Sequence, residues 1–159
     1  YTTRVDQQLV TIKDEISLIE NYLNIYALRM DRINYEISIP EEMMDEMILR
    51  LIIQPIIENA IVHGIEPKVG EGEISITGKI EQNKNIIIIE DNGLGMTCDE
   101  LKELSDTINL PLNEESKSYG MWNVNQRLSL QFGEGSGLTV TVPESGGLKV
   151  HLSWNRIKE

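Results

Sequence analysis

The sequence predicts an α+β fold, in which helices cover one face of a mixed, mostly antiparallel sheet of about five strands. Apolar residues recur every third or fourth position in residues 5–30, as expected for an amphipathic helix. Elsewhere they alternate with polar residues, the pattern of a strand, and short turns between such segments indicate hairpins. The predicted strands are residues 32–40, 73–79, 86–89, 138–142 and 149–154, and shorter helices are predicted over 97–104 and 121–132.

The middle of the chain has a long helical pattern followed later by a polar segment. Residues 41–63 form one helical region, in which Pro55 marks a first turn or a kink because its nitrogen has no hydrogen to donate. The helix that carries the site is therefore expected to begin near Ile52. The run at 86–89 is typical of a strand covered on both faces. Residues 105–118 are polar and lack a period, which predicts a mobile loop.

Composition limits the class of protein. With 159 residues, of which 40% are hydrophobic, the chain is the right size for one globular domain. A formal net charge of −12 argues against a nucleic-acid partner or an anionic membrane surface, since both are polyanions. A phosphate ligand would have to be held locally, by backbone amides and a metal ion. The single cysteine, Cys98, excludes an intrachain disulfide, and no segment has the pattern of a signal peptide or a membrane span.

The most informative segment is residues 54–64, which places polar side chains in an otherwise aliphatic helix. Buried polar groups cost free energy unless something binds them. Asn59 and His63 are four residues apart and share one helical face, whereas Glu58 points about 100° away. Gly64 is a natural helix stop. The face with Asn59 and His63 is a candidate binding wall, although a buried Asn is about as often a satisfied structural amide.

Two glycine-containing motifs follow this helix. The first, Asp91-Asn-Gly-Leu-Gly-Met96, comes directly after a predicted strand, and the second spans residues 118–128. Alone, an Asp with two glycines after a strand is more often an ordinary turn. In this order and at these intervals, however, the three motifs resemble the N, G1 and G2 boxes of the GHKL nucleotide-binding fold. The resemblance is in particular to sensor histidine kinases of the LytS/YesM type.

The resemblance implies a two-layer Bergerat sandwich that binds ATP with Mg²⁺. Asp91 would accept a hydrogen bond from the exocyclic amine of adenine. Gly93, Gly95 and Met96 would bring the backbone close to the base. Asn59 would face the magnesium ion that bridges the phosphates.

The two other polar residues of the site helix have alternatives. Glu58 would orient Asn59 or a metal-bound water, but a salt-bridged structural role fits its direction equally well. His63 would donate to a phosphate one turn further along, or it is a capping or surface residue.

The third motif departs from the family pattern, which has Gly-x-Gly-Leu before Asn-Val. Ser118 replaces the first glycine, so its φ must stay negative while backbone amides curl around phosphate. Gly120 and Met121 stand at the start of the predicted helix, where free amides and the helix dipole favour an anion. Asn123 and Arg127 would add donors, although Arg127 is equally suited to pair with a surface acid.

The resemblance therefore implies a catalytic domain that passes the γ-phosphoryl group of ATP to a histidine on an upstream helix. A GHKL ATPase is one alternative. In those proteins an acid usually lies four residues before the metal-binding Asn, and here Pro55 holds that position, which weighs against hydrolysis. A module that binds a nucleotide or a partner without catalysis is the other alternative, because of Ser118.

The same resemblance implies how the whole protein is organised. Residues 1–32 would be a helical connector from a dimerisation and phosphoacceptor region, and residues 33–159 the catalytic ATP-binding domain. The apolar stripe of the first helix either packs on this domain or continues a dimer-forming helix. The implied partners are the phosphoacceptor helix, a second subunit in a homodimer and a downstream response regulator, with no nucleic acid. The domain would be cytoplasmic, in a protein anchored in the bacterial membrane.

Overall fold

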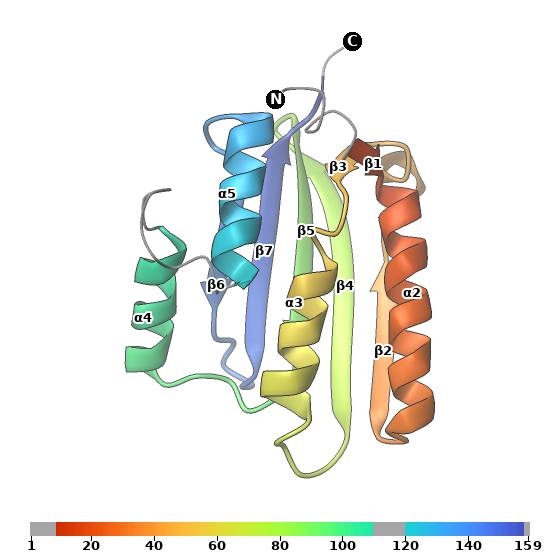
Figure 1. The fold of residues 1–159 in the computed structure, drawn as a ribbon, viewed down its shortest axis with the longest axis vertical. Helices are drawn as coiled ribbons and strands as arrows, with labels where there is room; N and C mark the ends of the chain where they lie inside the picture. The colour runs from red at the N-terminus through yellow and green to blue at the C-terminus, as the bar shows by residue number, and fades with distance from the viewer. Residues whose placement is uncertain (1–8, 110–119, 158–159) are drawn as a thin grey trace.

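The computed structural model describes residues 9–109 and 120–157. A layer of helices packs against one face of a five-stranded sheet, which confirms the predicted α+β class (Figure 1). The elements in chain order are strand β1 (Leu9–Thr11), helix α2 (Ile12–Arg29), β2 (Ile33–Ser38), the 3-10 helix η1 (Glu41–Met43), β3 (Met47–Leu49), α3 (Gln54–Asn59), its π-helical continuation η2 (Ala60–Ile65), β4 (Gly72–Glu81), β5 (Lys84–Asp91), α4 (Cys98–Ile108), α5 (Gly120–Phe132), β6 (Gly137–Thr141) and β7 (Leu148–Asn155).

The sheet has the strand order β2-β4-β5-β7-β6. Of its four strand pairs, β2–β4 is parallel and the other three are antiparallel. The prediction of a mixed, mostly antiparallel sheet of about five strands is therefore confirmed. The central strand β5 is buried on one face only, because Ile87 and Ile89 point into the core while Ile86 and Ile88 are half-buried on the other face. The prediction that this strand is covered on both faces was wrong.

A two-residue turn joins β4 to β5. It consists of Gln82 and Asn83, whose φ angles of 53° and 65° are both left-handed, as a tight hairpin with right-twisted strands requires. The turn is limited to these two positions, because Lys84 already pairs with Glu81.

Helices α2, α3 and α5 lie on the same face of the sheet, and α4 lies beside α5 and β6 (Figure 1). None of the helices in the described part of the chain is long and apolar enough to cross a membrane. The core between the two layers contains aliphatic side chains that are almost fully buried, together with one tryptophan: Ile12, Ile19, Leu23, Ile56, Ile57, Ile61, Ile76, Ile87, Leu128, Leu152 and Trp154.

Helix α2 packs its apolar stripe on the domain. The hydroxyl of Thr11 accepts a hydrogen bond from the Asp14 amide at 3.2 Å and caps the helix at its N-terminus. The helix begins at Ile12 instead of residue 5, because the three preceding residues form β1, which pairs with β3; residues 5–8 lie outside the described chain. The inward side chains are at most 5% exposed and belong to the core: Ile12, Ile16, Ile19 and Leu23.

The helical prediction for residues 41–63 is wrong in its first part. After the short helix η1, the chain forms β3, because its aliphatic residues find a partner strand in β1. A short apolar run does not reveal by its period whether it is a buried strand or a helix. Leu51 then adopts a left-handed φ of 59°. Helix α3 begins at Gln54, two residues later than predicted, and Pro55 lies in its first turn, where its missing N–H costs nothing.

Helix α4 is longer than predicted. It extends to Ile108, so the first residues of the loop predicted over 105–118 are helical. The rest of that loop, residues 110–118, lies outside the described residues. Its predicted mobility stays a prediction.

Candidate functional site

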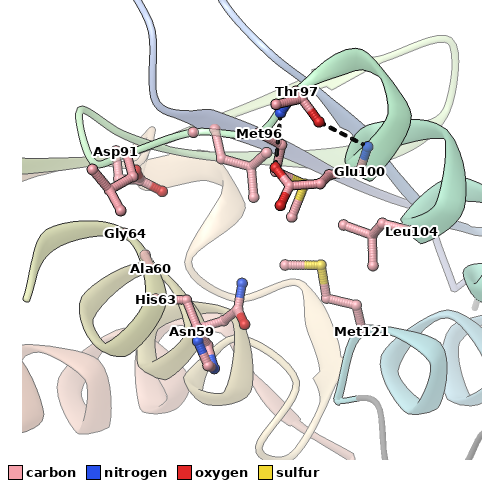
Figure 2. Close-up of a pocket in the computed structure, with 13 residues that line it drawn as sticks. Asn59, Ala60, His63, Gly64, Asp91, Met96, Thr97, Glu100, Leu104 and Met121 are labelled. Atoms are coloured by element: carbon pink, nitrogen blue, oxygen red, sulfur yellow. Dashed lines mark hydrogen bonds between the residues drawn. The ribbon is translucent and has the colours of Figure 1, made fainter. Parts of the chain in front are cut away.

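A cavity of about 760 Å³ lies between the helix pair α3–η2 and the segment that follows β5 (Figure 2). Cavities of roughly 300–1,000 Å³ are the usual size for binding a small molecule. Apolar side chains line most of it, and a few polar groups converge on it. The described lining residues are Asn59, Ala60, His63, Gly64, Asp91, Leu94, Gly95, Met96, Thr97, Glu100, Leu104, Met121 and Leu148.

The helical wall confirms that Asn59 and His63 share a face. Both side chains line the cavity, with Asn59 half-buried and His63 exposed. Between them α3 passes into the π-helix η2, in which the Glu66 amide donates to the Ile61 carbonyl at 2.8 Å. Such wide turns are rare and often lie at functional sites. Glu58 points away from the cavity, as predicted; it is exposed and accepts a 3.3 Å hydrogen bond from Gln54 Nε2.

Asp91 is a buried carboxylate at the end of the central strand. Its side chain is 6% exposed, and Oδ1 accepts a 2.8 Å hydrogen bond from the Gly93 amide. Burial raises its pKa from 3.8 to about 6, although the amides of Gly93 and Leu148 and the nearby Lys68 act in the opposite direction. A carboxyl group whose ionised form is destabilised by burial in this way is a candidate functional group.

Glycines allow the helix layer and the strand end to touch. The Leu94 amide donates to the Gly64 carbonyl at 3.0 Å, and a Cβ atom on Gly93 would lie 2.3 Å from the carbonyl carbon of Gly64. A Cβ atom on Gly64 would in turn lie 3.1 Å from Asp91 Oδ1. Gly64 lies inside η2 and has no left-handed φ, so it is needed for this close approach and is not the helix stop that we predicted.

The loop between β6 and β7 closes the site from the sheet side, which the sequence analysis missed. Gly147 has a φ of 80°, and a Cβ atom there would lie 1.9 Å from the Asp91 carbonyl oxygen. Gly95, with a φ of 75°, packs against the backbone of Gly147 and lines the cavity together with Met96. The Gly-Gly pair in this hairpin was the signal in the sequence, but only the fold shows what it touches.

Helix α4 supplies two polar lining residues that were also missed. Thr97 and Glu100 form a capping box: the Glu100 carboxylate accepts from the Thr97 amide at 2.9 Å, and the Thr97 hydroxyl accepts from the Glu100 amide at 3.1 Å. Figure 2 shows the second oxygen of Glu100 pointing into the cavity. The Thr-x-x-Glu pattern predicts a helix start, but its position beside the cavity follows from the fold.

Only some residues of the third motif lie at the cavity. Gly120 begins α5, and Met121 lines the cavity, whereas Ser118 lies outside the described residues. Asn123 is exposed and is not a lining residue. Arg127 is not among the described lining residues either, and its guanidinium donates to the backbone carbonyls of residues 50 and 51.

The sequence is similar to known proteins over most of its length. Residues 44–157 match the family described as "Histidine kinase-, DNA gyrase B-, and HSP90-like ATPase". The chain is 30% identical to the sensor histidine kinase YesM of Bacillus subtilis over 148 residues, covering 92% of this chain and 24% of that protein. It is 34% identical to the sensor histidine kinase YpdA of Escherichia coli over 131 residues, covering 82% of this chain and 22% of that protein. The chain thus spans about a quarter of the length of these relatives.

Solved structures share the fold. The catalytic domain of the histidine kinase ThkA superposes with a TM-score of 0.65 at 16% identity, covering 95% of this chain and 97% of that one. The mycobacterial sensor histidine kinase MprB gives 0.61 at 14% identity, covering 95% and 98%. ThkA in complex with the response regulator protein TrrA gives 0.66 at 15% identity, covering 94% and 41%. At these identities the likeness concerns the fold.

The glycine contact predicts how Asp91 responds to a small side chain. Replacing Gly93 with Ala should force the η2 backbone away from the strand end and destabilise the chain by about 1 to 3 kcal/mol. Water would then reach Asp91, so its pKa should move from about 6 towards 3.8, as read by NMR titration of the carboxyl carbon.

Gly70→Ala is the matched control, because Gly70 has a φ of 100° but no neighbouring atom within 4 Å of the position that a Cβ atom would take. It should cost about 1 to 2 kcal/mol in backbone strain and leave the pKa of Asp91 at about 6. An unchanged Asp91 pKa in Gly93→Ala would contradict the prediction that this contact excludes water from the carboxylate.

Proposed function

Because the chain belongs to the family of histidine kinase-, DNA gyrase B- and HSP90-like ATPases, we propose that it passes the γ-phosphoryl group of ATP to a histidine on a separate helix. The family match and the similar sensor histidine kinases confirm the resemblance predicted from the three motifs. One observation carries the proposal. A buried carboxylate, Asp91, ends the central strand in a cavity whose facing helix carries Asn59 and His63.

Asp91 suits an adenine base. One of its oxygens is occupied by the Gly93 amide, and the carboxylate retains free lone pairs for a donor on the ligand. Adenine offers its exocyclic amine, whereas guanine has a carbonyl oxygen at that position, which cannot donate. The apolar side chains of Leu94 and Met96 suit the faces of a flat base. We therefore assign this end of the cavity to adenine, with the backbone of Gly93, Gly95 and Met96 beside it.

Magnesium fits Asn59 as a single protein ligand. Within residues 9–109 and 120–157, no group of three or more His, Cys, Asp or Glu side chains is placed to hold a metal ion. Magnesium commonly takes one or two protein ligands and completes its shell with phosphate oxygens and water. Bound magnesium would neutralise phosphate charge. The amide of Asn59, which points into the cavity in Figure 2, is the group that would hold it.

The phosphate end of the ligand would lie towards the start of α5. Amides in the first turn of a helix lack an intrahelical partner, and together with the helix dipole they would favour an anion near Gly120 and Met121. His63, on the facing helix, lines the cavity and would donate to a phosphate. Asn123 and Arg127 do not belong to the described lining, and we do not assign them a direct contact with the ligand.

The acceptor histidine would come from another segment. The chain has two histidines. His63 lines the cavity and His151 lies within β7, where its Nδ1 atom is buried without a hydrogen-bond partner among the described residues. Neither is on a separate helix. We place the acceptor on an upstream helix, with residues 1–32 as its connector and residues 33–159 as the catalytic domain.

The remaining partners follow from the relatives. In a solved complex the histidine kinase ThkA binds a response regulator protein. We propose a response regulator as the downstream partner here, in a homodimeric full-length protein anchored in the membrane of a bacterial cell, with this domain in the cytoplasm.

Asp91→Asn should change ligand affinity and stability in opposite directions. Loss of a charge-assisted hydrogen bond in a desolvated site should weaken adenosine binding by about ten- to a hundredfold. The raised pKa means that ionised Asp91 destabilises the fold, and this penalty grows as the pH rises from 3.8 to about 6 and is complete above it. At pH 7.5 the variant should therefore gain up to about 3 kcal/mol in the free energy of unfolding.

Calorimetric titration with adenosine and guanosine, and urea unfolding at pH 4 and 7.5, measure both effects. Glu90→Gln is the control, because Glu90 is the neighbouring acid on the opposite face of β5 and pairs with Lys149; it should leave adenosine affinity unchanged. Equal binding of guanosine, or a joint loss of stability and affinity in Asp91→Asn, would remove the adenine assignment.

Asn59→Ala should remove the metal-dependent part of ATP binding. Without the amide, adding Mg²⁺ should raise ATP affinity far less than in the parent chain, while adenosine affinity stays nearly unchanged. Titrations of both ligands with and without Mg²⁺ test this. Val62→Ala, on the same helical segment but outside the cavity lining, should behave like the parent. If ATP and adenosine weaken in parallel as the melting temperature falls, Asn59 is a structural amide.

The chain should bind ATP and yet fail to label itself. Incubation with γ-labelled ATP should leave both histidines unmodified, because His63 lies in the cavity wall and His151 in a strand. Adding the upstream phosphoacceptor helix as a separate polypeptide should give acid-labile, base-stable phosphate on its histidine. This reaction should be slow, because no covalent link raises the effective concentration of the acceptor at the site. Strong self-labelling would overturn the proposed roles, and rapid phosphate release without an acceptor would favour an ATPase.

A further inference from the structure

Leu51 has a backbone conformation that an ordinary side chain rarely adopts. It lies between β3 and α3 with a φ of 59°, in the left-handed region, and its side chain is 44% exposed. A left-handed conformation is costly for a non-glycine residue and persists only where its surroundings hold it. The partly exposed side chain supplies little burial to compensate. Other groups must therefore keep Leu51 in place.

Glu15 of α2 is one such group. It is only 1% exposed, and its Oε1 atom accepts the Leu51 amide at 3.0 Å. Within the described chain its Oε2 atom is buried without a hydrogen-bond partner. Burying a carboxylate this deeply costs free energy unless its hydrogen bonds compensate for the lost hydration. The bond that the structure provides is the one to Leu51.

Arg127 of α5 holds the same residue from the other side. Its guanidinium donates to the Arg50 carbonyl at 2.7 Å and to the Leu51 carbonyl at 3.3 Å. Burial lowers the pKa of Arg127, and the charge of Glu15 acts in the opposite direction. The amide and the carbonyl of Leu51 are therefore held by opposite charges from two different helices.

The held residue stands immediately before the helix of the candidate site. Ile52 and Ile53 follow it and are fully buried, and α3 begins at Gln54. The direction of the chain at Leu51 thus sets where α3 and η2 start. These helices carry four lining residues of the cavity, namely Asn59, Ala60, His63 and Gly64. Helix α5, which carries Arg127, supplies a fifth, Met121.

We propose that Glu15 and Arg127 are positioning residues for nucleotide binding, which act by holding Leu51 in its left-handed conformation. In this role neither side chain needs to contact the ligand. This inference rests on the proposed function, since it concerns the affinity of the same cavity for ATP. It gives Arg127 a role different from phosphate binding, and it makes α2 part of the machinery that shapes the site.

A glycine at position 51 separates this role from general support of the fold. Glycine adopts a φ of about 60° without steric cost, so it should remove the need for the acid. Glu15→Ala should lower the affinity for Mg–ATP by about tenfold at a temperature well below its melting point. Glu15→Ala combined with Leu51→Gly should return to within about threefold of the parent, and Leu51→Gly alone should bind normally. Tenfold corresponds to about 1.4 kcal/mol, the size of such strain.

Three further variants sharpen the test. Glu15→Gln keeps an acceptor for the Leu51 amide and should retain affinity. Arg127→Ala should lose affinity like Glu15→Ala and recover with Leu51→Gly, whereas loss without recovery would point to a direct ligand contact. Glu20→Ala, an exposed acid on the same helix, should change nothing.

The backbone angles of residue 51, obtained from NMR chemical shifts without ligand, complete the experiment. They should stay left-handed in the parent chain and in Glu15→Gln, and change in Glu15→Ala. The inference is overturned if Glu15→Ala lowers only the melting temperature, or if Leu51→Gly restores no affinity. If the parent chain binds no ATP while the angles change as expected, the proposed function fails and the holding of Leu51 stands.

Discussion

The backbone contact between η2 and the end of β5 fixes the spacing of the two layers at the cavity. Gly64 and Gly93 meet so closely that neither tolerates a side chain without movement, and Gly147 presses on Asp91 from the opposite side. The Asp91 carboxylate is therefore enclosed by backbone rather than by water. Its raised pKa depends on this enclosure, and so would the selectivity for hydrogen-bond donors that we propose for it.

The site is a source of instability that the aliphatic core offsets. Asp91 is buried as an acid, Leu51 is held in a left-handed conformation and Glu15 has a buried oxygen without a described partner. All three lie on or beside the elements that form the cavity. Unfavourable local features of this kind gather where a protein binds its ligand. Here they are tolerated because isoleucine and leucine side chains from both layers fill the core.

The sequence predicted the features that depend on local chemistry. Periodicity located the sheet, and the polar residues of one helix located the wall with Asn59 and His63. Features that depend on contacts between distant segments were missed. Strand β3 forms only because β1 is beside it, and Gly147 matters only because Asp91 lies against it. The hydrogen bonds of Arg127 were missed for the same reason, since they reach carbonyl groups 76 and 77 residues away.

The charges around the cavity limit how it would bind the proposed triphosphate ligand. Its described lining includes two acids, Asp91 and Glu100, and no lysine or arginine. The chain as a whole carries a net charge of −12. Among the described lining residues, therefore, no lysine or arginine attracts an anionic ligand, and in the proposed binding mode a metal ion, backbone amides and the dipole of α5 would meet its charge. In the proposed binding mode, Asp91 at the base end would repel phosphate and would accept a hydrogen bond from the amine of adenine. The same distribution of charge would thus favour the proposed orientation of the nucleotide, with the base at the strand end and the phosphates near Asn59.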